Sequence, residues 1–376
     1  MNRILAFIKN EPVLIAACLL AAISAFFVPP DAEYFGYIDF RTLSILFCLM
    51  TVVAGLRGIG VFDILAQKML SNVKNMRQLV LIPVLLCFFL SMFITNDVAL
   101  ITLVPFTFTV LALAGGEYEK RLIIPVTAME TIAANLGSML TPLGNPQNLY
   151  LFGKADMSIG SFLLLMLPYS SVSLIMLLVW ILFLSRKDHE KLEIGFTQKA
   201  VLGSKKLMVV YLTLFVICLL SVVRLVHYGI TLAAVLITVL IADRKTLAKA
   251  DFSLLATFAG FFIFIGNMGR IQWFCDILEN IISGKEVLTA VISSQIISNV
   301  PAALLLSGFS DNISALIIGT NLGGLGTLIA SMASLISFKQ LSMKFPKLKG
   351  RYLACFTVSN IVFLLILMGV YFMIIR

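Results

Sequence analysis

The sequence predicts an all-α integral membrane protein with about nine full transmembrane helices, two of them broken, plus two re-entrant hairpins, in two inverted repeats. The first observation behind this fold class is composition, because 60% of the 376 residues are hydrophobic and only 12% are charged. About a quarter of the residues in an ordinary soluble domain are charged. The second observation is a series of apolar runs near the roughly 20 residues that a helix needs to cross a bilayer. The third is an internal repeat in the sequence.

The apolar stretches predict seven uninterrupted spans and two broken ones. The uninterrupted stretches lie at 12–28, 42–56, 161–185, 207–223, 229–242, 253–268 and 352–375. Polar and glycine residues interrupt the stretches at 122–150 and 313–337. Two pairs of shorter segments flank polar dipeptides and predict hairpins that enter the membrane and turn back: 78–94 with 98–114, and 286–297 with 300–309. Such hairpins persist only when they are packed in protein or line a wet cavity.

The basic residues predict the orientation of the chain in the cytoplasmic (inner) membrane. With the amino terminus inside and the carboxyl terminus outside, 22 of the 28 Lys and Arg residues fall in cytoplasmic segments, where such residues collect. We therefore attribute the net charge of +9 to membrane topology, and we expect the lipid bilayer and no nucleic acid as a partner. The run at 12–28 resembles a signal peptide, but we expect an uncleaved span because the repeat includes it.

The internal repeat relates residues 39–65 to residues 251–278. DFRTLSILFCLMTVVAGLRGIGVFDIL can be laid over DFSLLATFAGFFIFIGNMGRIQWFCDIL with one inserted residue. By the charge count Asp39 lies outside and Asp251 inside, so the copies run in opposite directions, as in secondary transporters whose sites form where the repeats meet. We expect one transmembrane transporter domain over 1–376, with inverted repeats at 1–185 and 207–376 and a cytoplasmic linker at 186–206.

Four interruptions of the apolar helices carry the polar residues from which we expect a binding site. They are Thr95-Asn96-Asp97, residues 135–148 (NLGSMLTPLGNPQN), Ser298-Asn299-Val300-Pro301 and residues 320–334 (TNLGGLGTLIASMAS). Free N–H groups at helix starts suit an anionic or strongly polar ligand, whereas unwound carbonyls and helix carboxyl ends suit Na⁺ or a proton. One break alone is as well explained by a kink or a close helix approach. Four breaks in matching pairs favour a binding site.

The candidate residues for substrate and ion binding lie within these interruptions. They are Thr95, Asn96, Asp97, Asn135, Thr141, Gly144, Asn145, Pro146, Asn148, Ser298, Asn299, Thr320, Asn321, Thr327 and Ser331. A Na⁺ ion is expected near Asn96, Asp97 and Asn299.

Two acidic residues, Asp97 and Glu130, are predicted deep in the membrane. A charged and unpaired side chain is costly there, so such a residue is a functional candidate by default. Asp97 lies at a hairpin tip, where a proton or Na⁺ would neutralise it. Glu130 lies in the helix that leads to the first break. A proton or Na⁺ would neutralise it in the same way, or else it pairs structurally with a basic residue such as Arg57.

Motifs of enzymes are absent from the sequence. It contains no HExxH, GxSxG or GxxxxGK(S/T), and its two histidines, His189 and His227, lie in or beside predicted loops. The six cysteines are scattered through apolar stretches without CxxC spacing, which favours neither a disulfide framework nor a zinc site. We expect no enzyme activity, no cofactor, and an H⁺ or Na⁺ gradient as the energy source.

Four segments resemble the ion transporter superfamily, which includes citrate transporter-like permeases, divalent anion/sodium symporters, arsenite permeases and a sodium/proton antiporter branch. They are TNDVALITLVPF at 95–106, NLGSMLTPLGNPQNLYLF at 135–152, SNVPAALLLSG at 298–308 and NLGGLGTLIASMASLISF at 321–338. The resemblance covers nearly the whole chain in the order of its elements. It implies two hairpin tips that meet beside two unwound helices, in a homodimer whose transport domain moves against a scaffold.

The resemblance also implies roles for individual residues. In dicarboxylate symporters both tips read Ser-Asn-Thr and bind Na⁺ and carboxylate groups together with the breaks. By position those roles fall to Thr95, Asn96, Ser298, Asn299, Asn145, Asn148, Thr327 and Ser331. The third tip residue departs from the pattern, being Asp97 in one copy and Val300 in the other, so two hydroxyl ligands are missing. An Asn-Asp tip is more similar to the arsenite permease branch.

The leading hypothesis is a secondary active transporter that moves a small anion, an inorganic oxyanion or carboxylate, or its neutral acid. A proton or sodium gradient would drive it through an elevator-type movement. The alternative is a cation/proton (Na⁺/H⁺) antiporter, which Asp97 and Glu130 motivate. A passive channel would conduct without accumulating its solute, and for a membrane enzyme no residues can be named.

Overall fold

The computed structural model describes residues 11–71, 73–186 and 200–375, which form helices joined by loops, with no strand among them. Arg3, Lys9 and the central part of the expected linker at 186–206 lie outside the described residues. The first half contains α2 (Pro12–Phe27), α3 (Tyr34–Tyr37), α4 (Phe40–Gly58), α5 (Val61–Leu70), α6 (Met76–Ile94), α7 (Asn96–Ala114), α8 (Gly116–Ser138), α9 (Pro146–Lys154) and α10 (Ile159–Leu184). The second half contains α11 (Lys205–Val222), α12 (Tyr228–Leu247), α13 (Phe252–Met268), α14 (Gln272–Ile282), α15 (Glu286–Ile297), α16 (Asn299–Ser307), α17 (Ile313–Gly323), α18 (Met332–Lys344), the 3₁₀ turn η1 (Pro346–Leu348) and α19 (Lys349–Ile375).

Each stretch expected to form a span or a hairpin limb contains a helix, and the all-helical class is confirmed. Among the described residues, six helices are long and apolar enough to cross a membrane, or seven if α13 and α14, bent by 108°, count as one span. α6 and α7, expected as re-entrant limbs, are each 19 residues long and satisfy this criterion alone. The protein is therefore a multi-pass membrane protein, while the count of nine spans stays a prediction.

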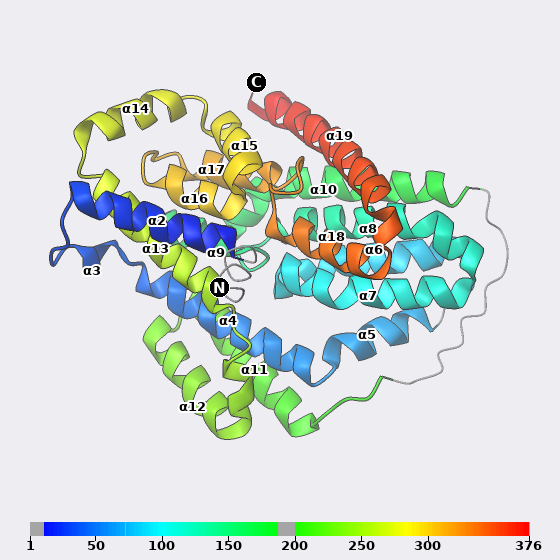
Figure 1. The fold of residues 1–376 in the computed structure, drawn as a ribbon. Helices are drawn as coiled ribbons and strands as arrows, with labels where there is room; N and C mark the ends of the chain where they lie inside the picture. Colours follow the sequence, from blue (N-terminus) through cyan, green and yellow to red (C-terminus); the bar gives the residue numbers. More distant parts are fainter. Residues whose placement is uncertain (1–10, 72, 187–199, 376) are drawn as a thin grey trace.

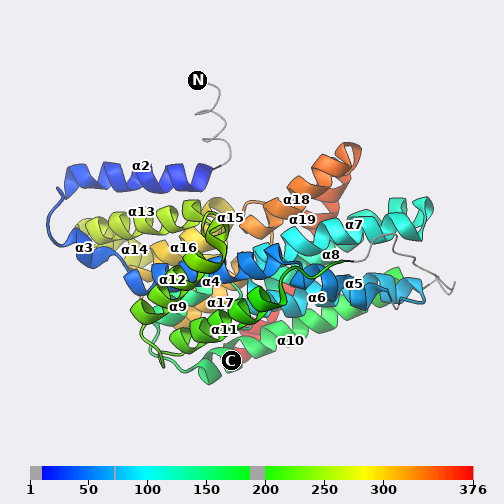
Figure 2. The same cartoon turned by 90° about the horizontal axis from the view of Figure 1, so that it is seen from below.

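The helices pack in two groups (Figure 1). In the first, which we call the α4–α13 group, α2 lies along α13, and α11 and α12 lie along α4. The second, the α8 group, is built on α8, which packs against α6, α7, α10, α18 and α19; α9 and α15 to α17 complete it. Figure 2 shows α2 and α10 on opposite faces of the molecule. The two groups meet where α9 packs against α4 and α16 packs against α13.

The two copies of the internal repeat begin with the same helix cap. Asp39 precedes α4 with φ −78° and accepts a 2.9 Å hydrogen bond from the Thr42 N–H. Asp251 precedes α13 with φ −79° and accepts a 2.9 Å bond from the Leu254 N–H. An aspartate in this position satisfies an N–H group that the helix itself leaves unpaired. The sequence match therefore reflects a shared local structure.

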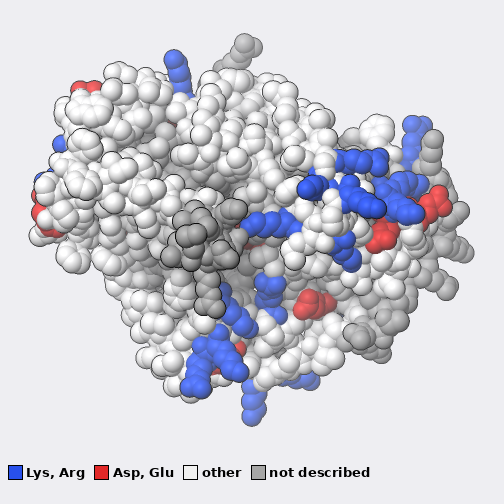
Figure 3. All heavy atoms as spheres, in the orientation of Figure 1, with Lys and Arg blue, Asp and Glu red and all other residues white. Residues whose placement is uncertain are grey.

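Basic side chains gather at one end of the molecule. Figure 3 shows them over the region where α7, α18 and the start of α19 lie. Exposed basic residues of this region include Lys120, Arg121, Lys344, Lys347 and Lys349. All five belong to segments predicted to be cytoplasmic, and the orientation itself stays a prediction.

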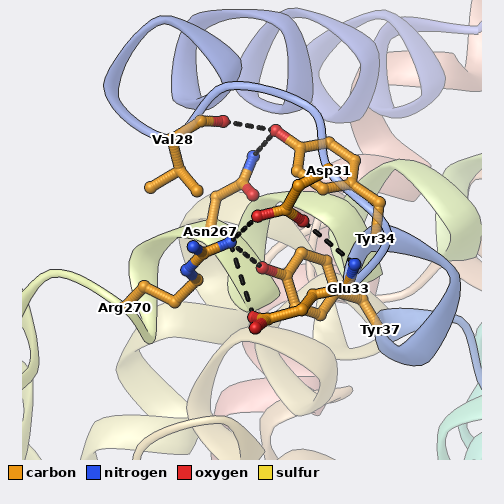
Figure 4. A network of polar contacts seen from close by, with 7 residues as sticks. All are labelled: Val28, Asp31, Glu33, Tyr34, Tyr37, Asn267 and Arg270. Atoms are coloured by element: carbon orange, nitrogen blue, oxygen red, sulfur yellow. Dashed lines mark hydrogen bonds and ion pairs between the residues drawn. The ribbon is translucent and has the colours of Figure 1, made fainter.

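At the opposite end a polar cluster joins α3 and the loop before it to the end of α13 (Figure 4). Arg270 Nη1 donates to Asp31 Oδ2 at 2.6 Å and to the Tyr37 hydroxyl at 3.2 Å. Asn267 Nδ2 donates to the Tyr34 hydroxyl at 2.8 Å. The hydrogen bond from Arg270 lowers the pKa of the Asp31 carboxyl below its ordinary value. This cluster fixes the loop between α2 and α4 against α13.

Candidate functional site

The two hairpin tips share an unusual backbone conformation. Thr95, between α6 and α7, has φ 70° and ψ 148°, and Ser298, between α15 and α16, has φ 73° and ψ 156°. A positive φ costs free energy in residues that carry a side chain, and it persists only where surrounding contacts impose it. Among the described residues only three non-glycine residues have a positive φ, and two of them are these tips. The backbone thus singles out both tips as candidate functional positions.

Each tip is bonded through its backbone to a break in another helix. The Asn96 N–H donates to the Gly144 carbonyl at 3.1 Å, and the Asn299 N–H donates to the Ala330 carbonyl at 3.0 Å. We had expected the N–H groups at these helix starts to be free for a ligand. That expectation is wrong for these two groups, because the unwound carbonyls beside the tips already accept their hydrogen bonds.

Side chains in the breaks also bond to the limbs of the hairpins. Thr141 Oγ1 donates to the Met92 carbonyl, and Thr327 Oγ1 donates to the Gln295 carbonyl at 3.3 Å. The Gln295 side chain accepts from the Thr327 N–H at 2.9 Å and donates to two carbonyls of the second break, those of Gly323 and Leu325. Sequence reasoning missed Gln295, although it is the single amide side chain in the apolar segment 286–297.

Asn321 joins the two breaks. Its Oδ1 accepts from Asn145 Nδ2 at 3.3 Å, and its Nδ2 donates to Asn148 Oδ1 at 2.6 Å. All three side chains are buried, being 0 to 3% exposed. Buried amides are costly unless they are hydrogen-bonded, so these contacts hold the two breaks together.

Asn135 forms the corresponding centre on the other side. Its Oδ1 accepts from Asn96 Nδ2 and from Ser331 Oγ, each at 3.0 Å, and its Nδ2 donates to Ser334 Oγ at 3.3 Å. The first tip, the first break and the second break therefore meet at this one side chain. Ser334 belongs to the interrupted run at 320–334 but was not among the expected site residues.

Thr320, Pro146 and Glu130 are among the expected residues that take no part in these side-chain contacts. Thr320 Oγ1 donates at 2.7 Å to the Leu316 carbonyl of its own helix. Pro146 opens α9, where its missing N–H costs nothing. Glu130 is fully buried in α8, where its Oε1 accepts from Thr107 Oγ1 at 2.5 Å and its Oε2 has no hydrogen-bond partner among the described residues.

A cavity of about 660 Å³ lies between the two helix groups, beside the first tip. Thr95, Asp97 and Asn145 line it from the α8 group. The opposite wall carries Glu11, Arg57, Lys249 and Asp251, at the ends of α2, α4, α12 and α13. Arg57 therefore faces the same cavity as Asp97, and the pairing of Arg57 with Glu130 that we had considered is not formed.

The charged side chains of the far wall were not expected in the site. Nothing in the local sequence places Glu11, Lys249 and Asp251 beside a hairpin tip, because each belongs to a different helix end. Burial and the neighbouring Asp251 raise the pKa of Glu11. Asp97 Oδ1 is buried and has no hydrogen-bond partner among the described residues.

The two groups also contact each other where α9 and α16 lead away from the tips, beside a smaller pocket of about 270 Å³. Tyr150 of α9 packs against the rings of Phe258 and Phe262 in α13, and its hydroxyl lies 2.9 Å from Ser307 Oγ at the end of α16. Lys154 Nζ donates to the Ser307 carbonyl. The cavity therefore reaches the first tip, and these contacts join the two groups at the other end of α9 and α16.

Within the described parts of the chain, no group of three or more His, Cys, Asp or Glu side chains is placed to hold a metal ion. The Na⁺ site expected near Asn96, Asp97 and Asn299 would use amide and carboxylate oxygens, and it stays a prediction.

Several known proteins similar to this chain are named as transporters or as membrane proteins. The family model described as "Citrate transporter" matches residues 4–314. The chain is 32% identical over 314 residues to an uncharacterised transporter of Methanocaldococcus jannaschii, covering 82% of each. It is 31% identical over 324 residues to the inner membrane protein YbiR of Escherichia coli, covering 84% of each. A shorter match, 32% identical over 155 residues, covers 41% of this chain and 31% of the silicon efflux transporter LSI3 of Oryza sativa subsp. japonica.

Proposed function

Because this chain belongs to the citrate transporter family, we propose that it is a secondary active transporter of a small oxyanion or carboxylate, or of the corresponding neutral acid. A proton or sodium gradient across the cytoplasmic membrane would drive it. The observation that carries the proposal is the contact of both breaks and the first tip through buried Asn and Ser side chains, beside a molecule-sized cavity. The family consists of transporters, so we propose no catalytic role.

Matched contacts support the inverted-repeat arrangement. Residues 135–148 and 321–334 align with a constant offset, and aligned residues make equivalent contacts. Asn145 aligns with Ser331, and Asn321 aligns with Asn135. The hydrogen bond between Asn145 and Asn321 therefore corresponds to the one between Ser331 and Asn135. About one helical turn later, the aligned residues Asn148 and Ser334 accept hydrogen bonds from Asn321 and Asn135, respectively. The aligned carbonyls of Gly144 and Ala330 accept hydrogen bonds from the N–H groups of the two tips. Two halves of like build around one site are what inverted-repeat transporters require.

The placement of the cavity supports alternating access by movement of the α8 group against the α4–α13 group. Arg57 and Lys249, on the cavity wall, belong to segments whose basic residues predict the cytoplasmic side. Tyr150 and Ser307 join the two groups at the other end of α9 and α16. These features support our proposal of an inward-open arrangement, from which an elevator-type shift of the α8 group would expose the site to the outside. A homodimer would anchor the group that does not move.

The second candidate function is a cation/proton antiporter. Two carboxyl oxygens favour it, because Asp97 Oδ1 and Glu130 Oε2 are both buried without a hydrogen-bond partner among the described residues. Each would be stabilised by a proton or by a cation. The relative named as a silicon efflux transporter favours the first candidate, because its name indicates an inorganic solute rather than a monovalent cation.

Gradient-driven uptake by the purified full chain in liposomes tests the proposal. Arsenite, citrate, succinate, sulfate and phosphate would each be offered with an inward proton or sodium gradient, and Na⁺/H⁺ exchange would be followed with an internal pH dye. We expect accumulation of one solute class above its external concentration, and loss of accumulation when the gradient is collapsed. Ion exchange without solute uptake would support the antiporter, and solute flux that never exceeds equilibrium would indicate a channel.

A further inference from the structure

The hydrogen-bond directions in the amide chain are fixed by backbone carbonyls. Asn148 Nδ2 lies 3.4 Å from the Ser138 carbonyl and 3.1 Å from the Thr141 carbonyl, and a carbonyl oxygen can only accept. The other end of Asn148, its Oδ1, must therefore face Asn321. Asn321 Nδ2 donates both to that oxygen and to the Ile317 carbonyl at 2.8 Å, so the Asn321 orientation is fixed as well.

The fixed directions determine which atom of Asn145 is left over. Asn321 Oδ1 can only accept, so Asn145 must present its Nδ2 to it, as observed at 3.3 Å. Asn145 Oδ1 then remains without a hydrogen-bond partner among the described residues, although the side chain is only 3% exposed. Asn145 lines the cavity. In the first break, the unpartnered atom of the cavity-lining Asn145 is therefore an acceptor, while Gln147 Nε2, also unpartnered among the described residues, belongs to a buried side chain that does not line the cavity.

The hairpin tip leaves an acceptor too. The Asp97 N–H donates to Asn96 Oδ1 at 2.9 Å, so Asn96 Nδ2 is the end that donates to Asn135. The donors of Asn96 are thereby directed into the protein. Asp97 Oδ1 is unpartnered among the described residues, and Asp97 lines the same cavity as Asn145. On this wall, both unpartnered side-chain atoms accept hydrogen bonds when Asp97 is ionised.

Charge and size narrow the class of ligand further. The cavity is lined by three carboxyl groups, Glu11, Asp97 and Asp251, and by two basic groups, Arg57 and Lys249, which disfavours a bare anion. The starts of α7 and α9 point positive helix ends toward this region, which disfavours a bare cation. A volume of about 660 Å³ fits a molecule with its water better than a single desolvated ion.

We propose that the site binds the uncharged, hydroxyl-bearing form of a weak oxyacid, with its hydroxyl groups donating to Asp97 Oδ1 and Asn145 Oδ1. A hydroxyl group both donates and accepts, so the same ligand also accepts hydrogen bonds from Arg57 and Lys249, which line the cavity. This inference rests on the proposed transport function and specifies the protonation state of its solute.

Boric acid and silicic acid serve as neutral probes, with sulfate as an anion that stays ionised and NaCl as the cation probe. Binding to the purified full chain is measured as a shift of the thermal unfolding midpoint with probe concentration. We expect the neutral acids to bind and sulfate not to bind. For boric acid, affinity should follow the fraction of neutral acid as the pH rises, and loss of binding should coincide with ionisation of the probe. Tighter binding of the ionised form would overturn the inference.

Substitutions of Asp97 separate the role of an acceptor atom from that of a charge. Asp97→Asn keeps an acceptor oxygen without charge, whereas Asp97→Leu removes the acceptor. For a neutral acid we expect Asp97→Asn to weaken binding by less than about tenfold and Asp97→Leu by about tenfold to a hundredfold, the range for a lost hydrogen bond to a charged group. A cation ligand would make the two variants equally defective, and an anion ligand would bind better to both. Asp276→Asn, on the exposed face of α14, controls for loss of one carboxylate elsewhere.

The outcomes keep this inference distinct from the proposed function. Gradient-driven accumulation of sulfate or citrate by the same liposomes would agree with the transport proposal and would contradict the neutral-acid inference. Binding of the neutral acids that is sensitive to Asp97→Leu, without any gradient-driven accumulation, would support the inference and contradict secondary active transport.

Discussion

Asn321 Nδ2 donates a 2.6 Å hydrogen bond to Asn148 Oδ1, which joins the two broken helices across 173 residues of sequence. Asn148 is 0% exposed, and its own Nδ2 donates to the carbonyls of Ser138 and Thr141. The Asn148 side chain thus forms hydrogen bonds within the first break and also joins the first break to the second. Its amide cannot be replaced by a carboxylate, although the two have the same shape.

We therefore predict that Asn148→Asp lowers stability by about 1–3 kcal/mol, because the carboxylate would face two carbonyl oxygens and offer them no hydrogen. Thermal unfolding of the purified protein measures this. The matched control is Asn312→Asp, because the exposed Asn312 acts only as an acceptor from the Ala315 N–H, and aspartate fills that capping role equally well. Equal unfolding temperatures for the two variants would show that the Asn148 contacts are unimportant.

Glycine is required where α13 meets Tyr37. A Cβ atom built on Gly266 would lie 2.2 Å from Cγ of the Tyr37 ring. Gly266→Ala should therefore displace Tyr37 from Arg270 and cost about 1–3 kcal/mol of stability, as overpacking does. Gly369→Ala in α19 is the control, because an added Cβ there meets nothing within 4 Å. Thermal unfolding should separate the two variants, and the double variant Gly266→Ala with Tyr37→Leu should recover part of the loss.

The Asp31–Arg270 pair predicts an acid-sensitive contribution to stability (Figure 4). The folded-state pKa of Asp31 lies below its unfolded value of about 3.9. The ionised carboxylate therefore stabilises the fold above that pH, and the contribution disappears as the pH falls through the lower, folded-state pKa. Asp31→Asn should be less stable than the wild type at neutral pH, and the difference should shrink under strongly acidic conditions. Thermal unfolding as a function of pH measures this, and Asp276→Asn should show no such convergence.

Glu130 should tolerate loss of its charge better than loss of its shape. Its Oε1 accepts from Thr107 and its Oε2 has no partner among the described residues, so a buried carboxylate would be costly. We predict that Glu130→Gln retains the Thr107 bond and the thermal stability, whereas Glu130→Leu loses about 1 kcal/mol. If Glu130 carries the coupling proton, Glu130→Gln should also lose the pH dependence of uptake in liposomes. An unchanged pH profile would assign Glu130 a purely structural role.

Arg224 should hold the two helix groups together on the side away from the cavity. It lies between α11 and α12 with φ 64°, and its Nη2 donates to the carbonyls of Gly153 at 3.1 Å and Ala155 at 3.3 Å, at the end of α9. We predict that Arg224→Gly changes the equilibrium constant between the present arrangement of the two groups and other arrangements by about two- to fivefold, in favour of the others. The effect is modest because the guanidinium is half exposed, and glycine is chosen because it suits the positive φ. Labelling of a cysteine placed at Val98 in the cavity should then slow. Faster or unchanged labelling would contradict a holding role.

Much of the local structure follows from the sequence. Apolar runs predict the helices because backbone groups in lipid must bond within their own segment. Asp39 and Asp251 occupy equivalent positions in the repeat of the sequence, and in the structure both cap the helix that follows. The polar dipeptides at 95–96 and 298–299 predict two equivalent turns, and the backbone angles of Thr95 and Ser298 agree within 10°. Each of these features depends on residues that are near one another in the chain.

Tertiary structure alone decided which of these elements meet. The sequence by itself determined a multi-pass helical protein with amide-bearing breaks, because hydrophobic patterns and local turns depend on residues within short segments of the chain. It did not reveal that Arg57 lines the same cavity as Asp97 instead of pairing with Glu130. It also did not reveal that the Gln295 side chain donates a hydrogen bond to a carbonyl of the second break. Those contacts join residues on different helices, and their partners depend on how the helices pack side by side. Packing likewise fixed the direction of each Asn side chain, and so left two acceptors facing the place where a ligand would bind.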